Sequence, residues 1–126
     1  MTSHIRQGFG TVRPYLYGAY ELPQFLVDVF GAREVERHEQ PNRRGAHVEL
    51  ALGDGAMVVE AGELPPTAKP TAASVYVYVE DVDAVYQRAT AAGAETIHPP
   101  TDQPYGERSC GFAAYGNTWW VATYTG

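Results

Sequence analysis

The sequence predicts an α+β fold built from two similar βαβββ modules, and three observations carry this prediction. Strand-like alternation and a helical stripe of apolar residues follow one another in the same order in each half of the chain. Each helical stripe ends in the same way, at Phe30-Gly31-Ala32 and at Ala92-Gly93-Ala94. A proline-rich segment without periodicity separates the halves at residues 62–73. We therefore predict a single domain of two duplicated modules, at about residues 11–61 and 74–124, whose small cores have to pack together.

The first module opens with β-branched and aromatic residues that predict a strand at residues 11–17. Large apolar residues then recur every three or four positions, which predicts a helix over residues 22–30 with Pro23 in its first turn and Gly31 as its C-terminal cap. Three strands complete the module, and a Gly-Asp-Gly sequence forms the hairpin between the last two. These strands are predicted at residues 34–39, 46–52 and 56–61.

The second module repeats this order. An alternating strand is predicted at residues 74–79, and Glu80-Asp81 provides the acidic entry that favours a helix N-terminus. Val82, Val85 and Ala89 form the helical stripe that follows, and Gly93 ends it. The remaining segments are a short strand at 95–98, a proline-rich loop at 99–106 and two strands at 108–115 and 118–124 joined by a Gly116-Asn117 hairpin.

Composition excludes several classes of function. The formal net charge is −6 and no basic cluster exceeds the Arg43-Arg44 pair, so we expect no nucleic-acid partner. Uninterrupted apolar stretches are only a few residues long, so we expect no membrane span. The N-terminus lacks the apolar region of a signal peptide, and the lone Cys110 cannot form an internal disulfide. We therefore expect a cytoplasmic protein.

Three segments carry a resemblance to a known family. They are Phe30-Gly31-Ala32 at the first helix exit, residues 78–84 at the second helix entry, and residues 102–108 followed by 115–123 near the C-terminus. Together with the duplicated βαβββ order they resemble the vicinal oxygen chelate superfamily of glyoxalase I, bleomycin resistance proteins and extradiol dioxygenases, in its PhnB-like branch. The resemblance covers nearly the whole chain, and it implies a curved mixed sheet around a ligand cavity.

The resemblance also implies four metal-binding positions, two in each module, that usually carry His, Gln or Glu. In this chain they fall near residues 11–13, around 57–59, at Ser74 and at Trp120, and Glu60 is the nearest carboxylate to the second. We therefore expect no cofactor, with a divalent metal as the alternative. Because the family's chemistry uses its metal as a Lewis acid or oxygen-binding centre, we do not expect a standard glyoxalase or dioxygenase activity.

Strand alternation predicts which side chains line the cavity. The aliphatic side of each strand should pack under its helix, which leaves the other side open to a ligand. This open side is largely aromatic with a few polar groups, as in many small-molecule sites. The candidate ligand-binding residues are Arg13, Tyr15, Tyr17, His47, Glu49, Ser74, Tyr76, Tyr78, Trp120 and Tyr124, with Tyr105 and Arg108 added from the loop that could cover the cavity mouth.

Three functions remain open. The first is a metal-free protein that binds a small molecule by aromatic stacking and sequesters a drug or natural product, as in antibiotic resistance. The second is a lyase, isomerase or dioxygenase, with His47 and Glu49 as acid–base candidates or with a displaced metal site that adds Glu60. The third is a scaffold whose aromatic face contacts another protein. We expect a homodimer, a structural role for His98 and Cys110, and no assignable role for His38.

Overall fold

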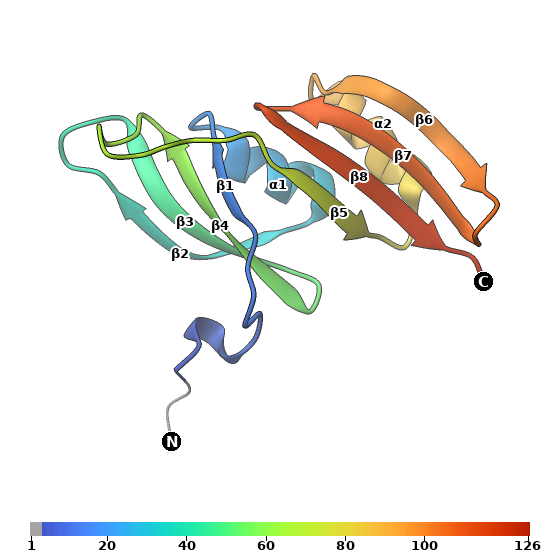
Figure 1. The fold of residues 1–126 in the computed structure, drawn as a ribbon, viewed down its shortest axis with the longest axis horizontal. Coiled ribbons are helices and arrows are strands. Elements are labelled where there is room, and N and C mark those ends of the chain that lie inside the picture. The colour runs from blue at the N-terminus through green and yellow to red at the C-terminus, as the bar shows by residue number, and fades with distance from the viewer. Residues whose placement is uncertain (1–3) are drawn as a thin grey trace. The chain divides into compact units, whose positions relative to one another are not determined.

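The computed structural model describes residues 4–126, which form two compact units that divide between Thr71 and Ala72. Each unit contains one four-stranded mixed sheet with one helix against it, as Figure 1 shows. The predicted α+β class and the βαβββ order of both modules are therefore confirmed.

The first unit begins with a short 3₁₀ turn and then follows the predicted order. Its sheet has the strand order β1-β4-β3-β2, in which β1 runs parallel to β4 and the other neighbours are antiparallel. The elements are η1 (Arg6–Gly8), β1 (Tyr15–Gly18), α1 (Leu22–Phe30), β2 (Arg33–Glu39), β3 (Gly45–Leu52) and β4 (Gly55–Gly62).

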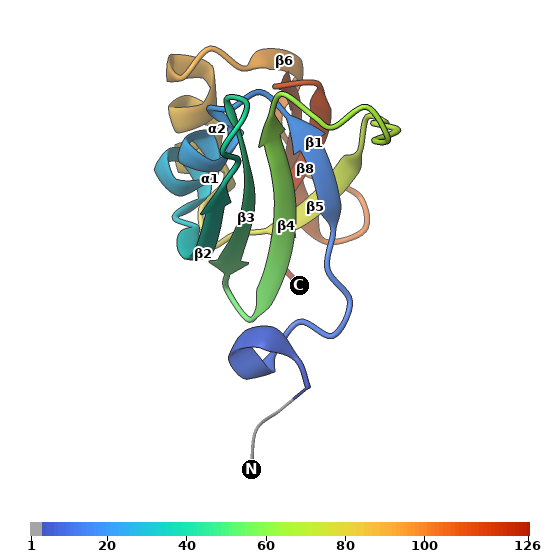
Figure 2. The ribbon, with the colours of Figure 1, turned by 90° about the vertical axis from the view of Figure 1, so that its left-hand side faces the viewer.

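Helix α1 covers one face of this sheet, as the side view in Figure 2 shows, and contacts β2, β3 and β4. Leu16, Val59 and Val48 lie side by side across three strands and are fully buried under the helix. Burial of each such side chain contributes about 1.5–3 kcal/mol. Gly31 ends the helix in the left-handed conformation, with φ 73°, and its N–H bonds to the last turn, a geometry that favours glycine. Among the described residues of this unit, no α-helix packs against the other face of the sheet.

The second unit has the same topology, with the strand order β5-β8-β7-β6 and a parallel β5–β8 pair. Asp81 caps its helix, because the carboxylate accepts a hydrogen bond from the Ala84 N–H at 3.1 Å. Trp119 and Phe112 are cross-strand partners and are fully buried on the helix side. The elements are β5 (Ser74–Tyr78), α2 (Val82–Ala91), β6 (Glu95–Gln103), β7 (Glu107–Ala114) and β8 (Asn117–Tyr124).

Two predicted strands have different bounds in the structure. Strand β1 begins at Tyr15 rather than at residue 11, because Pro14 has no N–H for the sheet and the chain turns at Gly10, where φ is 74°. Strand β6 continues to Gln103 through two prolines that were predicted to lie in a loop. Because β6 is an edge strand and its pairing skips from His98 to Thr101, the prolines remove no bond from the sheet.

The hairpin between β7 and β8 lies one residue earlier than predicted. Tyr115 and Gly116 form its turn, with φ values of 52° and 82°, and Asn117 already belongs to β8. Positive φ at both turn residues matches the right-handed twist of the flanking strands.

No helix in the described part of the chain is long and apolar enough to cross a membrane. The cytoplasmic location stays a prediction.

Candidate functional site

The open face of the second sheet carries exposed aromatic side chains. Tyr76 on β5 and Trp120 on β8 are cross-strand partners on this face. Tyr124, at the C-terminal end of β8, is the cross-strand partner of Glu107 at the start of β7. Tyr105 follows from the turn that precedes β7. We call this set the aromatic face; it comprises Tyr76, Tyr78, Tyr105, Glu107, Trp120 and Tyr124. The four tyrosines are 49%, 62%, 64% and 70% exposed in chain order.

Glu107 is the polar centre of the aromatic face. The Tyr76 hydroxyl donates to one carboxylate oxygen, and the Tyr78 hydroxyl donates to the other at 2.5 Å. These two hydrogen bonds lower the pKa of Glu107, and the same contacts raise the pKa of both phenols. At neutral pH the face therefore presents a carboxylate held by neutral phenols. Among residues 4–126, Glu107 has no Lys, Arg or His partner.

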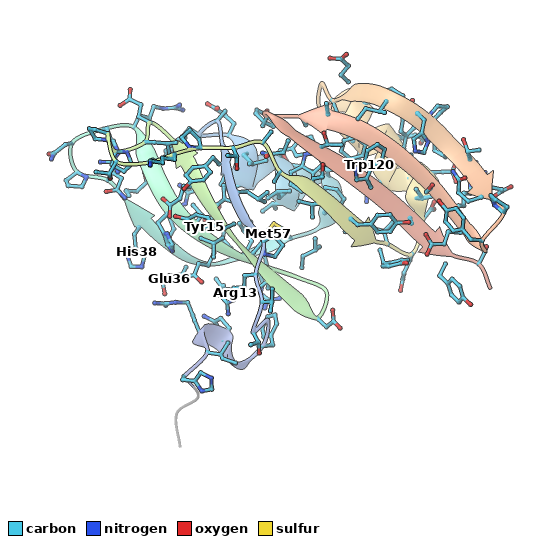
Figure 3. The ribbon with its side chains drawn as sticks, in the orientation of Figure 1. Arg13, Tyr15, Glu36, His38, Met57 and Trp120 are labelled. Atoms are coloured by element: carbon cyan, nitrogen blue, oxygen red, sulfur yellow. The ribbon has the colours of Figure 1, made fainter. Side chains whose placement is uncertain are left out.

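Trp120 lies flat over the middle of the second sheet. A Cβ atom on Gly111, its neighbour on β7, would come within 2.5 Å of Trp120 Cζ3, so the ring needs glycine at that position. His98 stacks on the indole, with ring centroids 5.9 Å apart and an interplanar angle of 25°. Figure 3 labels Trp120 on this sheet. His98 thus supports the aromatic ring, in line with the structural role expected for it.

The open face of the first sheet is polar. His47 and Glu60 are cross-strand partners on β3 and β4, and Tyr15 and Tyr17 on β1 lie on the same face. The two tyrosine rings stack with centroids 5.4 Å apart, and the Tyr15 hydroxyl donates to Glu60 at 3.2 Å. Burial and the Glu60 carboxylate raise the pKa of Tyr15 to about 12. Strand alternation therefore predicted the correct face for both tyrosines and for His47.

His47 is held between two carboxylates. Its Nδ1 contacts Glu60 and its Nε2 lies 3.3 Å from Glu49. Burial by itself would lower the pKa of His47, but the hydrogen bonds that its ring donates to Glu60 and Glu49 outweigh burial and raise that pKa above its ordinary value. Both ring nitrogens are engaged, so a role as general base requires His47 to leave one of these contacts.

Two arginines of the N-terminal segment neutralise the carboxylates of this polar face. Arg13 Nη1 lies 2.5 Å from Glu49, and Arg6 lies 3.1 Å from Glu49 and 2.7 Å from Glu36. Arg13 also donates to the carbonyl of Phe9 at 3.0 Å, which folds the segment back on itself. Its side chain is only 12% exposed. The predicted candidates Arg13 and Glu49 thus form one ion pair.

Arg108 is not on the aromatic face, although it was predicted to line the cavity. Its guanidinium bonds to Asp83 on α2 at 2.8 and 2.9 Å and to Asp102 at 3.3 Å, which places it on the helix side of the sheet. The physical reason is alternation, because Glu107 and Ser109 on either side of it take the open face. Cys110 is buried on the helix side as well, and burial raises the pKa of its thiol to about 11.

Ser74 shares the open side of β5 with the tyrosines and is exposed beside Thr118.

Sequence reasoning missed Glu107 and His38. His38 is the cross-strand partner of His47, with ring centroids 6.2 Å apart. Figure 3 shows His38 with Glu36, Arg13 and Tyr15 in the first unit. His38 could have been placed beside His47 only by predicting the register of β2 against β3, because the two histidines lie on different strands.

The four positions that the family resemblance assigns to a metal do not carry a suitable set of donors. Arg13, near the first, is a cation. Ser74 and Trp120 occupy the third and fourth, and an indole ring offers no lone pair to a metal. Glu60, beside the second position, is the one carboxylate at or next to these four positions. In the part of the chain that the structure describes, no group of three or more His, Cys, Asp and Glu side chains could hold a metal ion. The lack of a metal cofactor stays a prediction.

Comparison with known proteins gives a consistent result. The model of the glyoxalase/bleomycin resistance protein/dioxygenase superfamily matches residues 22–121. TioX from Micromonospora sp. ML1 is 31% identical to this chain, with a TM-score of 0.68 over 90% of this chain and 98% of TioX. No curated protein matches the sequence significantly.

Two further solved structures share the fold at lower identity. The PhnB protein from Bacillus cereus is 14% identical, with a TM-score of 0.68 over 90% of this chain and 98% of that protein. The fosfomycin resistance protein FosX from Listeria monocytogenes is 18% identical, with a TM-score of 0.64 over 93% of each chain. Similarity at this level concerns the fold alone, so the PhnB-like branch stays a prediction.

Proposed function

The chain belongs to the glyoxalase/bleomycin resistance protein/dioxygenase superfamily, and from this premise we propose that it is a small-molecule-binding protein. The ligand is a planar aromatic molecule that stacks on the aromatic face of the second unit. The family includes bleomycin resistance proteins, so sequestration of a drug or natural product is the physiological role that we propose.

The exposure of the tyrosines supports this proposal most directly. Four tyrosines that are about half to two-thirds exposed surround one carboxylate on a sheet face that the unit's helix does not cover. Several exposed aromatic side chains gathered on one face are uncommon on a monomer and are typical of ligand-binding or protein-interaction surfaces. A planar ligand that stacks on one ring gains about 0.5–1.5 kcal/mol beyond the burial of its area.

Quenching of the intrinsic tryptophan fluorescence, to which Trp119 and Trp120 both contribute, by acridine, a neutral planar probe at mildly alkaline pH, tests the proposal. We expect saturable quenching that weakens several-fold in Tyr78→Leu, which removes one ring of the aromatic face. The matched control is Tyr86→Leu, because Tyr86 belongs to the same unit but lies on α2, where its hydroxyl bonds to Thr96 at 2.9 Å. Equal binding by both variants, or no saturable binding by the parent protein, would refute the proposed function.

A second candidate function is acid–base catalysis on the polar face of the first unit. The observation that favours it is His47, whose raised pKa and carboxylate neighbours suit a proton donor. Chemical conversion of a compound that the protein binds, lost in His47→Gln while the compound still binds, would support catalysis. Unchanged ligand after prolonged incubation with the parent protein would favour binding alone.

We also propose that the protein is a homodimer, because two small modules gain buried surface by association. The same argument supplies the competing interpretation of the aromatic face, in which the tyrosines contact a second copy of the chain. Competition between ligand binding and association separates the two interpretations.

A further inference from the structure

Glu107 differs from Glu49 and Glu60 of the first unit in having no Lys, Arg or His beside it among residues 4–126. On the polar face, Glu49 lies within 3.1 Å of Arg6 and within 2.5 Å of Arg13, and Glu60 contacts His47. On the aromatic face, the partners of Glu107 are the Tyr76 and Tyr78 hydroxyls. The polar face therefore pairs Glu49 and Glu60 with cations of its own chain, whereas the aromatic face presents a carboxylate that a ligand's charge can still neutralise.

We propose that the ligand of the aromatic face is an organic cation, a planar molecule with an alkylated ring nitrogen or an ammonium group, whose charge lies against Glu107 and the faces of the surrounding tyrosines. This inference rests on the proposed function and specifies the chemical class of its ligand.

The geometry around Glu107 suits a cation. Tyr76 and Tyr78 stand next to each other with ring centroids 5.4 Å apart and an interplanar angle of 58°, so a group placed over both rings meets two π systems at different angles. Tyrosine faces attract cations through the negative potential of the ring. An ionised carboxylate has about four acceptor directions, and the two phenols occupy two of them. The remaining directions are available to a donor or a positive charge.

The nearest arginine in the sequence does not compete for this position. Arg108 follows Glu107 directly, but its side chain lies on the opposite side of the sheet, where Asp83 and Asp102 accept all of its contacts. The net charge of −6 also attracts rather than repels a cationic ligand. The aromatic face thus suits a cation by its exposed aromatic rings, its carboxylate and the absence of a Lys, Arg or His partner for Glu107 among residues 4–126.

A matched pair of ligands tests the inference. Acridine and N-methylacridinium have nearly the same planar shape, but only the second carries a permanent charge at mildly alkaline pH. We expect calorimetric titration to give an affinity about tenfold higher for N-methylacridinium, from cation–π attraction and the nearby carboxylate. The preference should shrink as the salt concentration rises, because the site is exposed and its charge is screened.

Two variants identify Glu107 as the source of the preference. Glu107→Gln keeps an acceptor for the tyrosine hydroxyls but removes the charge, so we expect it to bind both probes with affinities within about twofold of each other. Glu95→Gln is the matched control, because Glu95 is an exposed carboxylate on β6 of the same unit and its loss changes the net charge equally. The control should keep the tenfold preference.

The outcomes separate this inference from the proposed function. Equal affinity of the parent protein for both probes would overturn the cation site but leave stacking on the aromatic face intact. A charge preference that survives in Glu107→Gln would also overturn it. If neither probe binds, the proposed function itself fails. If Tyr78→Leu converts a dimer to a monomer by sedimentation and leaves binding of both probes unchanged, the face is an interface between copies and the cation site is excluded.

Discussion

Adding one methyl group at Gly111 tests whether Trp120 lies flat over the sheet. The Cβ of Gly111→Ala would lie 2.5 and 2.6 Å from two ring carbons of Trp120 and 3.3 Å from His98 Cδ2. Carbon atoms prefer separations of about 3.5–4.0 Å, so the indole has to move by about 1 Å or more. The methyl group cannot be accommodated without displacing Trp120 from His98.

The energetic cost can be estimated from opposing effects. Overpacking of this kind costs about 1–3 kcal/mol, and a half-buried ring relieves part of it by tilting outward. Alanine regains about 0.5–1 kcal/mol over glycine in a strand, because it restricts the unfolded chain. We therefore expect Gly111→Ala to lower the free energy of unfolding by about 1 kcal/mol, with weaker binding of acridine because the stacking surface has moved.

A double-mutant cycle with Trp120→Leu makes the test specific. Without the indole ring, Gly111→Ala should be neutral or stabilising by about 0.5 kcal/mol, so the coupling energy between the two positions is about 1.5 kcal/mol. Urea unfolding followed by circular dichroism measures all four proteins. If Gly111→Ala has the same effect with and without Trp120, the ring does not lie over Gly111 and the description of the aromatic face is wrong.

Four other outcomes are expected. Arg13→Gln should lower the free energy of unfolding by about 1–2 kcal/mol, because among the described residues Glu49 then keeps Arg6 and His47 as charged partners. Urea unfolding measures this change, and an unchanged unfolding midpoint would exclude the ion pair as a stabilising contact. The folded-state pKa of His47 is raised, so its stabilising contribution is complete below the ordinary histidine pKa of about 6.5 and disappears as the pH rises through the folded-state pKa. In a series of urea unfolding midpoints at rising pH, the stability of the parent protein should fall over this range, and His47→Gln should not show this fall. Elemental analysis after equilibration with Zn, Ni, Mn and Fe(II) should find no stoichiometric metal, and stoichiometric metal would mean that the four ligand positions were wrongly assigned. Sedimentation at micromolar concentration should give the mass of a dimer, whereas a mass near the 13.8 kDa of one chain would exclude it.

The faces of the strands were predictable because alternation is a local property of the chain. Once a strand is recognised, each side chain takes the face opposite to that of its neighbour, so His47, Tyr76 and Tyr78 could be assigned to the open faces without knowledge of the fold. Helix ends were predictable for the same reason, since the Gly31 backbone and the Asp81 side chain act only on the adjacent helical turn. The exact role of each residue in binding stays a prediction.

What could not be predicted depends on register and on contacts between distant segments. Glu107 lies between the predicted loop at 99–106 and the predicted strand at 108–115, and only the pairing of β7 with β8 places it opposite Tyr124. Arg108 was judged by its position after a proline-rich turn, but its partner Asp83 lies 25 residues earlier on α2. The approach of Arg6 to Glu36 joins residues 30 apart. No local pattern in the sequence encodes these distances.

The two units use the same local arrangement with different charge partners. In each, the first strand carries two tyrosines at alternate positions with ring centroids 5.4 Å apart. In each, a glutamate accepts a hydrogen bond from a tyrosine hydroxyl, Glu60 in the first unit and Glu107 in the second.

The difference between the units lies in what faces that glutamate. His47 on the neighbouring strand contacts Glu60, and its raised pKa shows that the carboxylates favour its charged form. Glu107 is flanked on its own strand face by the small Ser109, which hydrogen-bonds to Gln103 and brings no charge. The first unit thus places a cationic side chain beside its glutamate, whereas the described residues of the second unit place none beside Glu107. The proposed cation site rests on this difference between two otherwise similar sheets.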